Sequence, residues 1–203
     1  IRGSFGHEQG AAWAGGIGAL AVLLVAKRAD WYTRFLTATL AAAVGWGIGG
    51  IISYGLVVGY GRGDDFGNVW YGFSMLLVIG GLFGWIGGGL FGLALSDRAA
   101  NKVQWHNLIV EMTCGGLLFY YFLVREFEFL MTPPRGEEWA ACLGMAFALT
   151  WHLFRNNHHA PIRVAVFAAL GAGFGFAFGN FLQVMGRSAG LDFINLWNVM
   201  EYS

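Results

Sequence analysis

The chain has 203 residues, of which 57% are hydrophobic and only 12% are charged, and its mean hydropathy is +0.56. Soluble domains usually carry about 25% charged residues, so the composition excludes an ordinary soluble domain. The formal net charge is zero, which gives no electrostatic basis for binding nucleic acid, and we expect no nucleic-acid partner.

Six apolar segments reach, or nearly reach, the roughly 20 residues that a helix needs to cross a bilayer. In chain order they are residues 10–26, 35–60, 69–95, 105–124, 138–154 and 162–185. None of them alternates polar and apolar residues as a strand does, so we expect helices throughout. The sequence therefore predicts an all-α integral membrane protein, a glycine-rich polytopic bundle with about six transmembrane helices.

The basic residues between the predicted helices indicate how the chain is oriented. Connections 27–34, 96–104 and 155–163 contain most of the lysines and arginines, and cytoplasmic connections are typically rich in these residues. The basic residues concerned are Lys27, Arg28, Arg34, Arg98, Lys102, Arg155 and Arg163. This pattern predicts that the three connections lie inside, that the N-terminus lies outside, and that the protein resides in a plasma membrane of the bacterial inner-membrane type.

Two short stretches recur in the second half of the chain at nearly the same spacing. "AAVGWGIG" (42–49) resembles "AALGAGFG" (168–175), and "DFGNVW" (65–70) resembles "DFINLW" (192–197). We interpret this similarity as an internal duplication whose unit is four helices. Because the unit has an even number of spans, both copies share one orientation, and the repeat is parallel.

The duplication divides the chain into two parts. Residues 1–130 form the first four-helix repeat, and residues 131–203 form the start of a second, truncated copy. The chain also begins with Ile rather than Met. We therefore expect it to be a piece of a longer protein with further helices.

Glycines recur every four residues in several predicted helices. The longest series is Gly80, Gly84, Gly88 and Gly92, and a shorter one is Gly171, Gly175 and Gly179. Small residues at this spacing let helix backbones approach closely in lipid, where hydrophobicity does not drive helices together. We expect tight helix packing along these series; the alternative is that they let helices slide, as in a gate.

Glu111 is the most informative single residue, because it lies well inside the predicted helix 105–124. A carboxylate at that depth costs a few kcal/mol unless it is protonated, paired or hydrated, and it indicates a functional site by default. Gln104, Asn107, Glu111 and Cys114 share one helix face, which we expect to point into the bundle or a cavity. Glu111 would then bind a cation or carry a proton; the structural alternative is a protonated carboxyl hydrogen-bonded to a neighbouring helix.

Asn180, Gln183 and Arg187 form a second polar face at the outer end of the predicted helix 162–185. Together with Gln104, Asn107 and Glu111 they are our candidate transport residues. The alternative is an ordinary interfacial helix end, with the Arg187 side chain extended toward the membrane surface.

The predicted outside connections carry acidic and amide side chains directly before two apolar segments. These are Asp64, Asp65 and Asn68 in the first copy, and Asp192 and Asn195 in the second. Such residues cap the N-termini of helices, and this is the interpretation we favour. The alternative is that the acidic connections, with Glu8, Glu137 and Glu138, attract a cation or hold a metal.

The sequence contains no recognisable catalytic constellation. A Ser/His/Asp arrangement, a metalloprotease HExxH and a phosphate-binding loop are all missing. Cys114 and Cys142 lack zinc or redox spacing, and His158 and His159 fit a solvated connection better than a metal site. We therefore predict no catalytic residue, no metal and no cofactor.

These features favour a channel or secondary transporter that uses an intramembrane carboxylate. The alternative is a non-transporting anchor or scaffold module of a larger protein or complex, and a membrane-embedded enzyme fits less well. The expected partners are the lipid bilayer, a small ion or proton, and either further copies of the chain or an attached soluble domain.

Overall fold

The computed structural model describes residues 7–98, 101–191 and 193–202, with the backbone alone for His7, Glu201 and Tyr202. These residues are built from helices and contain no strand, which confirms the all-α prediction. The elements are α2 (His7–Ala26), α3 (Ala29–Tyr32), α4 (Phe35–Gly49), α5 (Gly55–Tyr60), α6 (Phe66–Ser96), α7 (Trp105–Phe119), the π-helix η1 (Tyr120–Glu126), α8 (Glu138–Arg155), α9 (His159–Ser188) and α10 (Leu196–Tyr202).

Four helical stretches are long and apolar enough to cross a membrane, and they suggest a membrane location. They are Glu8–Ala26, Phe66–Ser96, Trp105–Glu126 and His159–Ser188. The prediction of six such helices is not confirmed. Helix α4 has only 15 residues, and α8, with 18 residues, is less apolar than the four helical stretches named above.

The predicted helix over 35–60 is interrupted in its second half. Helix α4 ends at Gly49, and α5 begins only at Gly55. Gly49 and Gly50 both have a low helix propensity, and two β-branched isoleucines follow them. The chain tightens here into short-range turns, with the Ile52 amide donating to the Gly49 carbonyl oxygen at 3.0 Å.

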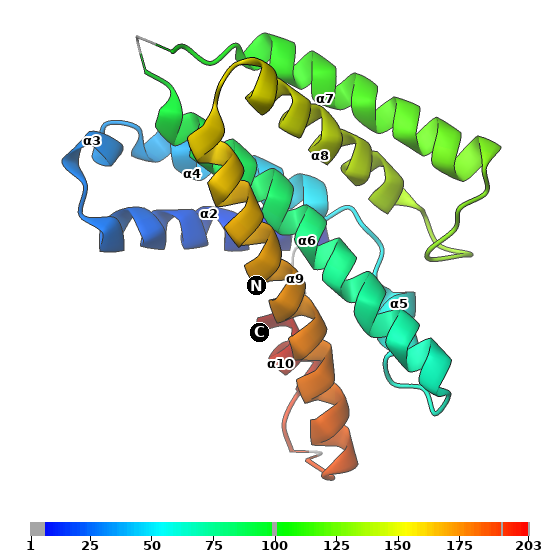
Figure 1. The fold of residues 1–203 in the computed structure, drawn as a ribbon. Helices are drawn as coiled ribbons and strands as arrows, with labels where there is room; N and C mark the ends of the chain where they lie inside the picture. The colour runs from blue at the N-terminus through cyan, green and yellow to red at the C-terminus, as the bar shows by residue number, and fades with distance from the viewer. Residues whose placement is uncertain (1–6, 99–100, 192, 203) are drawn as a thin grey trace.

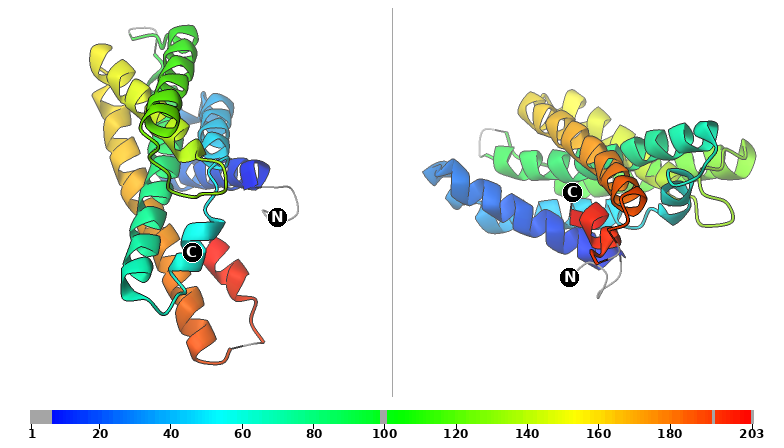
Figure 2. Two further views of the ribbon diagram at one scale, coloured as in Figure 1. Left: turned by 90° about the vertical axis from the view of Figure 1, so that its right-hand side faces the viewer. Right: turned by 90° about the horizontal axis from the view of Figure 1, so that it is seen from below.

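Helix α6 lies at the centre of the bundle. It contacts α4, α5, α8 and α9, and 78% of its most apolar stretch is buried, against 17% for α7 with η1 and 17% for α9. Figure 1 shows the α2–α4 hairpin and the α7–α8 hairpin on different sides of α6, while α9 runs beside it. Helix α10 turns back along the far end of α9 (Figure 2).

The contact between α6 and α9 depends on the glycines of α6. A side chain at Gly84 would collide with the Ala168 carbonyl oxygen, and one at Gly80 would collide with the Ala172 carbonyl oxygen. The two helices therefore run antiparallel with their backbones in direct contact. The shorter series on α9 behaves differently, because Gly171 is exposed and has open space around it.

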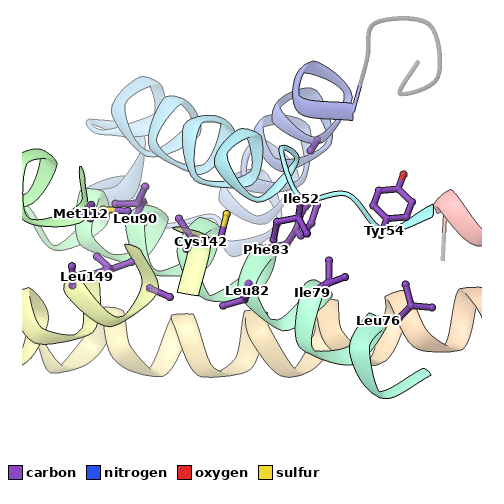
Figure 3. Close-up of a cluster of buried hydrophobic side chains, with 14 of the residues drawn as sticks. Ile52, Tyr54, Leu76, Ile79, Leu82, Phe83, Leu90, Met112, Cys142 and Leu149 are labelled. Carbon is purple, nitrogen blue, oxygen red and sulfur yellow. The ribbon is translucent and has the colours of Figure 1, made fainter. Parts of the chain in front are cut away.

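The core extends from this contact along the other faces of α6. Figure 3 shows side chains from the α4–α5 segment, α6, α7 and α8 converging there, among them Ile52, Phe83, Met112, Cys142 and Leu149. The outward faces of α2, α7 and α9 carry large apolar side chains that remain exposed, including those of Ile17, Leu117, Phe167 and Phe174. Such a wide apolar surface is unusual for a soluble monomer.

The three basic connections predicted to lie inside meet at one end of the bundle (upper left in Figure 1). The Asp30 carboxylate in the first connection lies 3.7 Å from the Arg98 guanidinium in the second. The Nδ2 atom of Asn101, in the second connection, lies 3.3 Å from the Nδ1 atom of His158, in the third. The shared end fits connections on one side of a membrane.

The two stretches that suggested a duplication lie in different structural settings. Residues 42–49 form the end of α4, whereas residues 168–175 lie in the middle of α9, which continues to Ser188. The four-helix repeat, with parts 1–130 and 131–203, stays a prediction.

The close contact between α6 and α9 can be tested with one added methyl group. We expect Gly84→Ala to lower the free energy of unfolding by about 1–3 kcal/mol, because the new Cβ overlaps backbone atoms of α9. Gly171→Ala is the matched control, since nothing lies within 4 Å of its Cβ position. Thermal unfolding of detergent-solubilised protein gives the comparison; equal Tm values for the two variants would contradict the contact.

Candidate functional site

Glu111 in α7 contacts the last turn of α8. Its Oε2 atom lies 2.9 Å from His152 Nδ1, and the guanidinium of Arg155 donates to its Oε1 atom. Helices α7 and α8 form an antiparallel pair, and Gly115 and Gly144 face each other with no room for a side chain. This approach brings the three polar side chains within hydrogen-bonding range, and Glu111 is therefore paired.

His152 is the innermost member of this trio. The imidazole is 1% exposed, compared with 22% for the Glu111 side chain and 47% for that of Arg155. Its Nε2 atom is buried and has no hydrogen-bond partner within the described part of the chain. One imidazole nitrogen thus faces Glu111, and the other lies buried without a partner among the described residues.

The polar face predicted on α7 is only partly inward. The buried side of this helix is formed by Leu108, Met112 and Gly116 instead. Gln104 is exposed and accepts a hydrogen bond from Asn107 at the start of the helix. Hydrophobic packing against α8 therefore sets the rotation of α7. Among the polar residues predicted to share one face, Gln104, Asn107, Glu111 and Cys114, it is Glu111 that bonds to the neighbouring helix α8.

A second buried histidine extends the polar region beyond α8. His158, in the α8–α9 connection, is 4% exposed and bonds to Asn101. Burial lowers the pKa of His158, the nearby charge of His152 lowers it further, and Asp97 acts in the opposite direction. The end of the bundle with the basic connections therefore holds two neighbouring imidazoles.

Asn180 and Gln183 lie on one face of α9 near the opposite end of the bundle. Both side chains are 0% exposed, and none of their four amide nitrogen and oxygen atoms has a hydrogen-bond partner among the described residues. Leaving a buried polar group unpaired costs about 1–3 kcal/mol. An arrangement of this kind requires a specific explanation.

Two arginines lie beside these amides. Gly61 packs directly against the Asn180 amide, and the next residue, Arg62, places its guanidinium 5.2 Å from the centroid of the Trp197 ring. Arg187 follows Gln183 by one turn on the same face of α9 and is exposed. Burial lowers the pKa of Arg62, and the charge of Arg187 lowers it further. Positive charge is thus concentrated at the amides.

The acidic and amide residues before α6 and α10 act as helix caps, although the two helices use different members of the pattern. At the start of α6, Asp65 Oδ1 accepts a hydrogen bond from the backbone N–H group of Asn68 at 2.8 Å. At the start of α10, Asn195 Oδ1 accepts a hydrogen bond from the backbone N–H group of Asn198 at 3.2 Å. Asp192 lies outside the described residues.

Glu137 is a structural anchor of the connection between η1 and α8. Its carboxylate is buried and accepts hydrogen bonds from the Met131 amide at 2.8 Å, the Thr132 amide at 2.8 Å and the Trp139 indole at 2.7 Å. With three donors committed to it, this carboxylate is not available to a cation in solution.

The remaining acidic residues do not assemble a metal site. Glu8 and Asp64 are exposed and Glu138 is partly exposed. Across residues 7–98, 101–191 and 193–202, no group of three or more His, Cys, Asp or Glu side chains is placed to hold a metal ion. Cys114 is exposed, and the Cys142 thiol lies 3.5 Å from the Ile48 carbonyl oxygen.

Comparison with known proteins finds no matching family model, no matching curated protein and no matching solved structure. Function must therefore be inferred from the two polar groups, Glu111 with His152 and Asn180 with Gln183. Sequence reasoning identified Glu111 but missed its partners His152 and Arg155, which resemble any polar residues at a helix end. It also missed Arg62, which only the fold brings next to Asn180.

The anchoring role of Glu137 predicts that the same substitution destabilises the protein at Glu137 but not at the adjacent Glu138. We expect Glu137→Gln to lower the free energy of unfolding by about 1–3 kcal/mol, since one acceptor becomes a donor that faces buried N–H groups. Glu138→Gln should have little effect. Chemical denaturation in detergent measures both variants, and equal losses would argue against the anchor.

Proposed function

We propose that the protein is a multi-pass membrane channel or secondary transporter, and that it moves protons or proton-coupled solutes through the Glu111–His152 pair. The observation that carries the proposal is the buried imidazole of His152. One nitrogen is bonded to a carboxylate on the neighbouring helix, and the other has no partner in the described structure.

The three side chains have distinct roles in this proposal. Arg155 balances the charge of Glu111, so the pair remains in an apolar setting without an isolated ion. Glu111 orients the imidazole and stabilises its protonated form. His152 carries the proton, because histidine changes charge near neutral pH more readily than any other side chain.

The proposed orientation follows the basic connections. With these connections on the cytoplasmic side, the N-terminus lies outside and the Glu111–His152 pair lies near the cytoplasmic surface. The asymmetric clustering of Arg28, Arg98 and their neighbours at one end of the bundle supports this assignment. We further propose a plasma membrane of the bacterial inner-membrane type.

The alternative function is a non-transporting anchor or scaffold, and one observation favours it. The bonds from Glu111 to His152 and Arg155 link α7 to α8, and an interhelical link of this kind would also serve a rigid membrane module. In that case the residues stabilise the hairpin and move nothing.

Proton flux into proteoliposomes distinguishes the two functions. We expect vesicles with wild-type protein to acidify faster than protein-free vesicles when potassium and valinomycin impose an inward-driving potential, as read by a trapped pH-sensitive dye. Glu111→Gln and His152→Gln should reduce the flux to the protein-free level, because each removes one half of the pair. Glu138→Gln is the control and should behave as wild type.

The opposite outcomes are equally informative. Wild-type vesicles that acidify no faster than protein-free vesicles would contradict transport and favour the anchor. Full flux in a folded Glu111→Gln variant would exclude this pair from the mechanism. Retention of the wild-type gel-filtration profile verifies that each variant is folded.

A further inference from the structure

The polar group at the far end of α9 contains an unusual number of buried donors and acceptors without hydrogen-bond partners among the described residues. Three buried nitrogen atoms that donate hydrogen bonds have no partner in the described structure: Asn180 Nδ2, Gln183 Nε2 and Arg62 Nε. Two buried acceptors, Asn180 Oδ1 and Gln183 Oε1, are also unpartnered. Native structures rarely leave so many adjacent buried polar atoms unpaired.

The placement of these groups is enforced by the fold. The Asn180 amide packs against Gly61, where any side chain would occupy its position. The Trp197 indole from α10 holds the Arg62 guanidinium by a cation–π contact at 5.2 Å. Three separate segments of the chain therefore converge on these polar atoms.

The two charged side chains of this group, Arg62 and Arg187, are both positive. Arg62 and Arg187 are close enough for their charges to interact, and neither forms an ion pair with an Asp or Glu among the described residues. The Arg62 Nε–H group is buried and has no hydrogen-bond partner among the described residues. Two neighbouring cations and several amide donors favour an anion with several oxygen atoms.

We propose that Asn180, Gln183, Arg62 and Arg187 form a binding site for an oxyanion of the phosphate class that also carries a hydroxyl group. The two arginines and the amide N–H groups would bind the phosphate oxygens. A hydroxyl would donate to Asn180 Oδ1 or Gln183 Oε1, which a fully deprotonated anion such as sulfate cannot do. This site is separate from the Glu111–His152 pair and does not depend on the proposed proton transport.

Two sources can supply this chemistry. Hydrogen phosphate in solution carries both the charge and a hydroxyl, and so does the headgroup of phosphatidylglycerol, whose glycerol supplies the hydroxyl. Arg187 lies in the last turn of α9 and is exposed, so a solute or a lipid headgroup would make its first contact there.

The first measurement uses the full chain in a neutral detergent. We expect sodium phosphate to raise the Tm more than sodium sulfate at equal ionic strength if the ligand is a solute. In nanodiscs, we expect the protein to retain phosphatidylglycerol over phosphatidylcholine, as read by native mass spectrometry, if the ligand is a lipid. Selective effects in either assay support the site and identify the source.

Variants separate this site from general electrostatics. Arg187→Gln removes an exposed charge, so the protein should still fold while the affinity for the selected ligand falls about tenfold to a hundredfold. Arg135→Gln removes an exposed arginine from the η1–α8 connection and should leave the affinity unchanged.

Gln183→Met provides the sharpest test, because binding and stability should move in opposite directions. Methionine has a similar length and no unpartnered amide, so the ligand-free Tm should rise while ligand binding is lost. A fall in Tm would mean that Gln183 stabilises the fold through bonds of its own. That result, or an absence of selectivity for phosphate and for phosphatidylglycerol alike, would overturn the proposal.

Discussion

The structure depends on the direct backbone contact between α6 and α9. In lipid, hydrophobicity does not draw helices together, so association relies on close packing and polar contacts. Gly80, Gly84, Gly88 and Gly92 supply that packing by removing every side chain from one stripe of α6. Helix α9 is held against α6 from Pro161 to Phe176. The connection to α8 therefore lies against the basic end of the bundle, and Asn180 lies against Gly61.

The two polar groups that result differ in how their charges are paired. Near the basic connections, Glu111 is balanced by Arg155 and bonded to His152, so the charges there are paired and one imidazole nitrogen is left over. At the far end, Arg62 and Arg187 lie beside Asn180 and Gln183 with no carboxylate bonded to them in the described structure. The first group contains a carboxylate paired with a guanidinium, whereas both charged side chains of the second group are positive.

The sequence alone predicts the parts of this architecture that depend on composition and local pattern. Continuous apolar segments identify the helices, and the Asp and Asn residues before α6 and α10 indicate where those helices begin. It does not predict the break after Gly49, because glycines also occur throughout the continuous helix α6. Nor does it predict contacts between residues far apart in sequence: only the fold brings Arg155 to Glu111 and Arg62 to Asn180.

The interruption of α4 has a consequence for the surrounding lipid. A helix of 15 residues is about 22 Å long at 1.5 Å per residue, whereas the hydrocarbon core of a bilayer is about 30 Å thick. Helix α6 has 31 residues, is about 46 Å long, and exceeds that thickness by about 16 Å. A bilayer crossed by α4 as well as α6 would have to thin beside α4 while α6 tilts. Such a bilayer would be deformed unevenly around the protein.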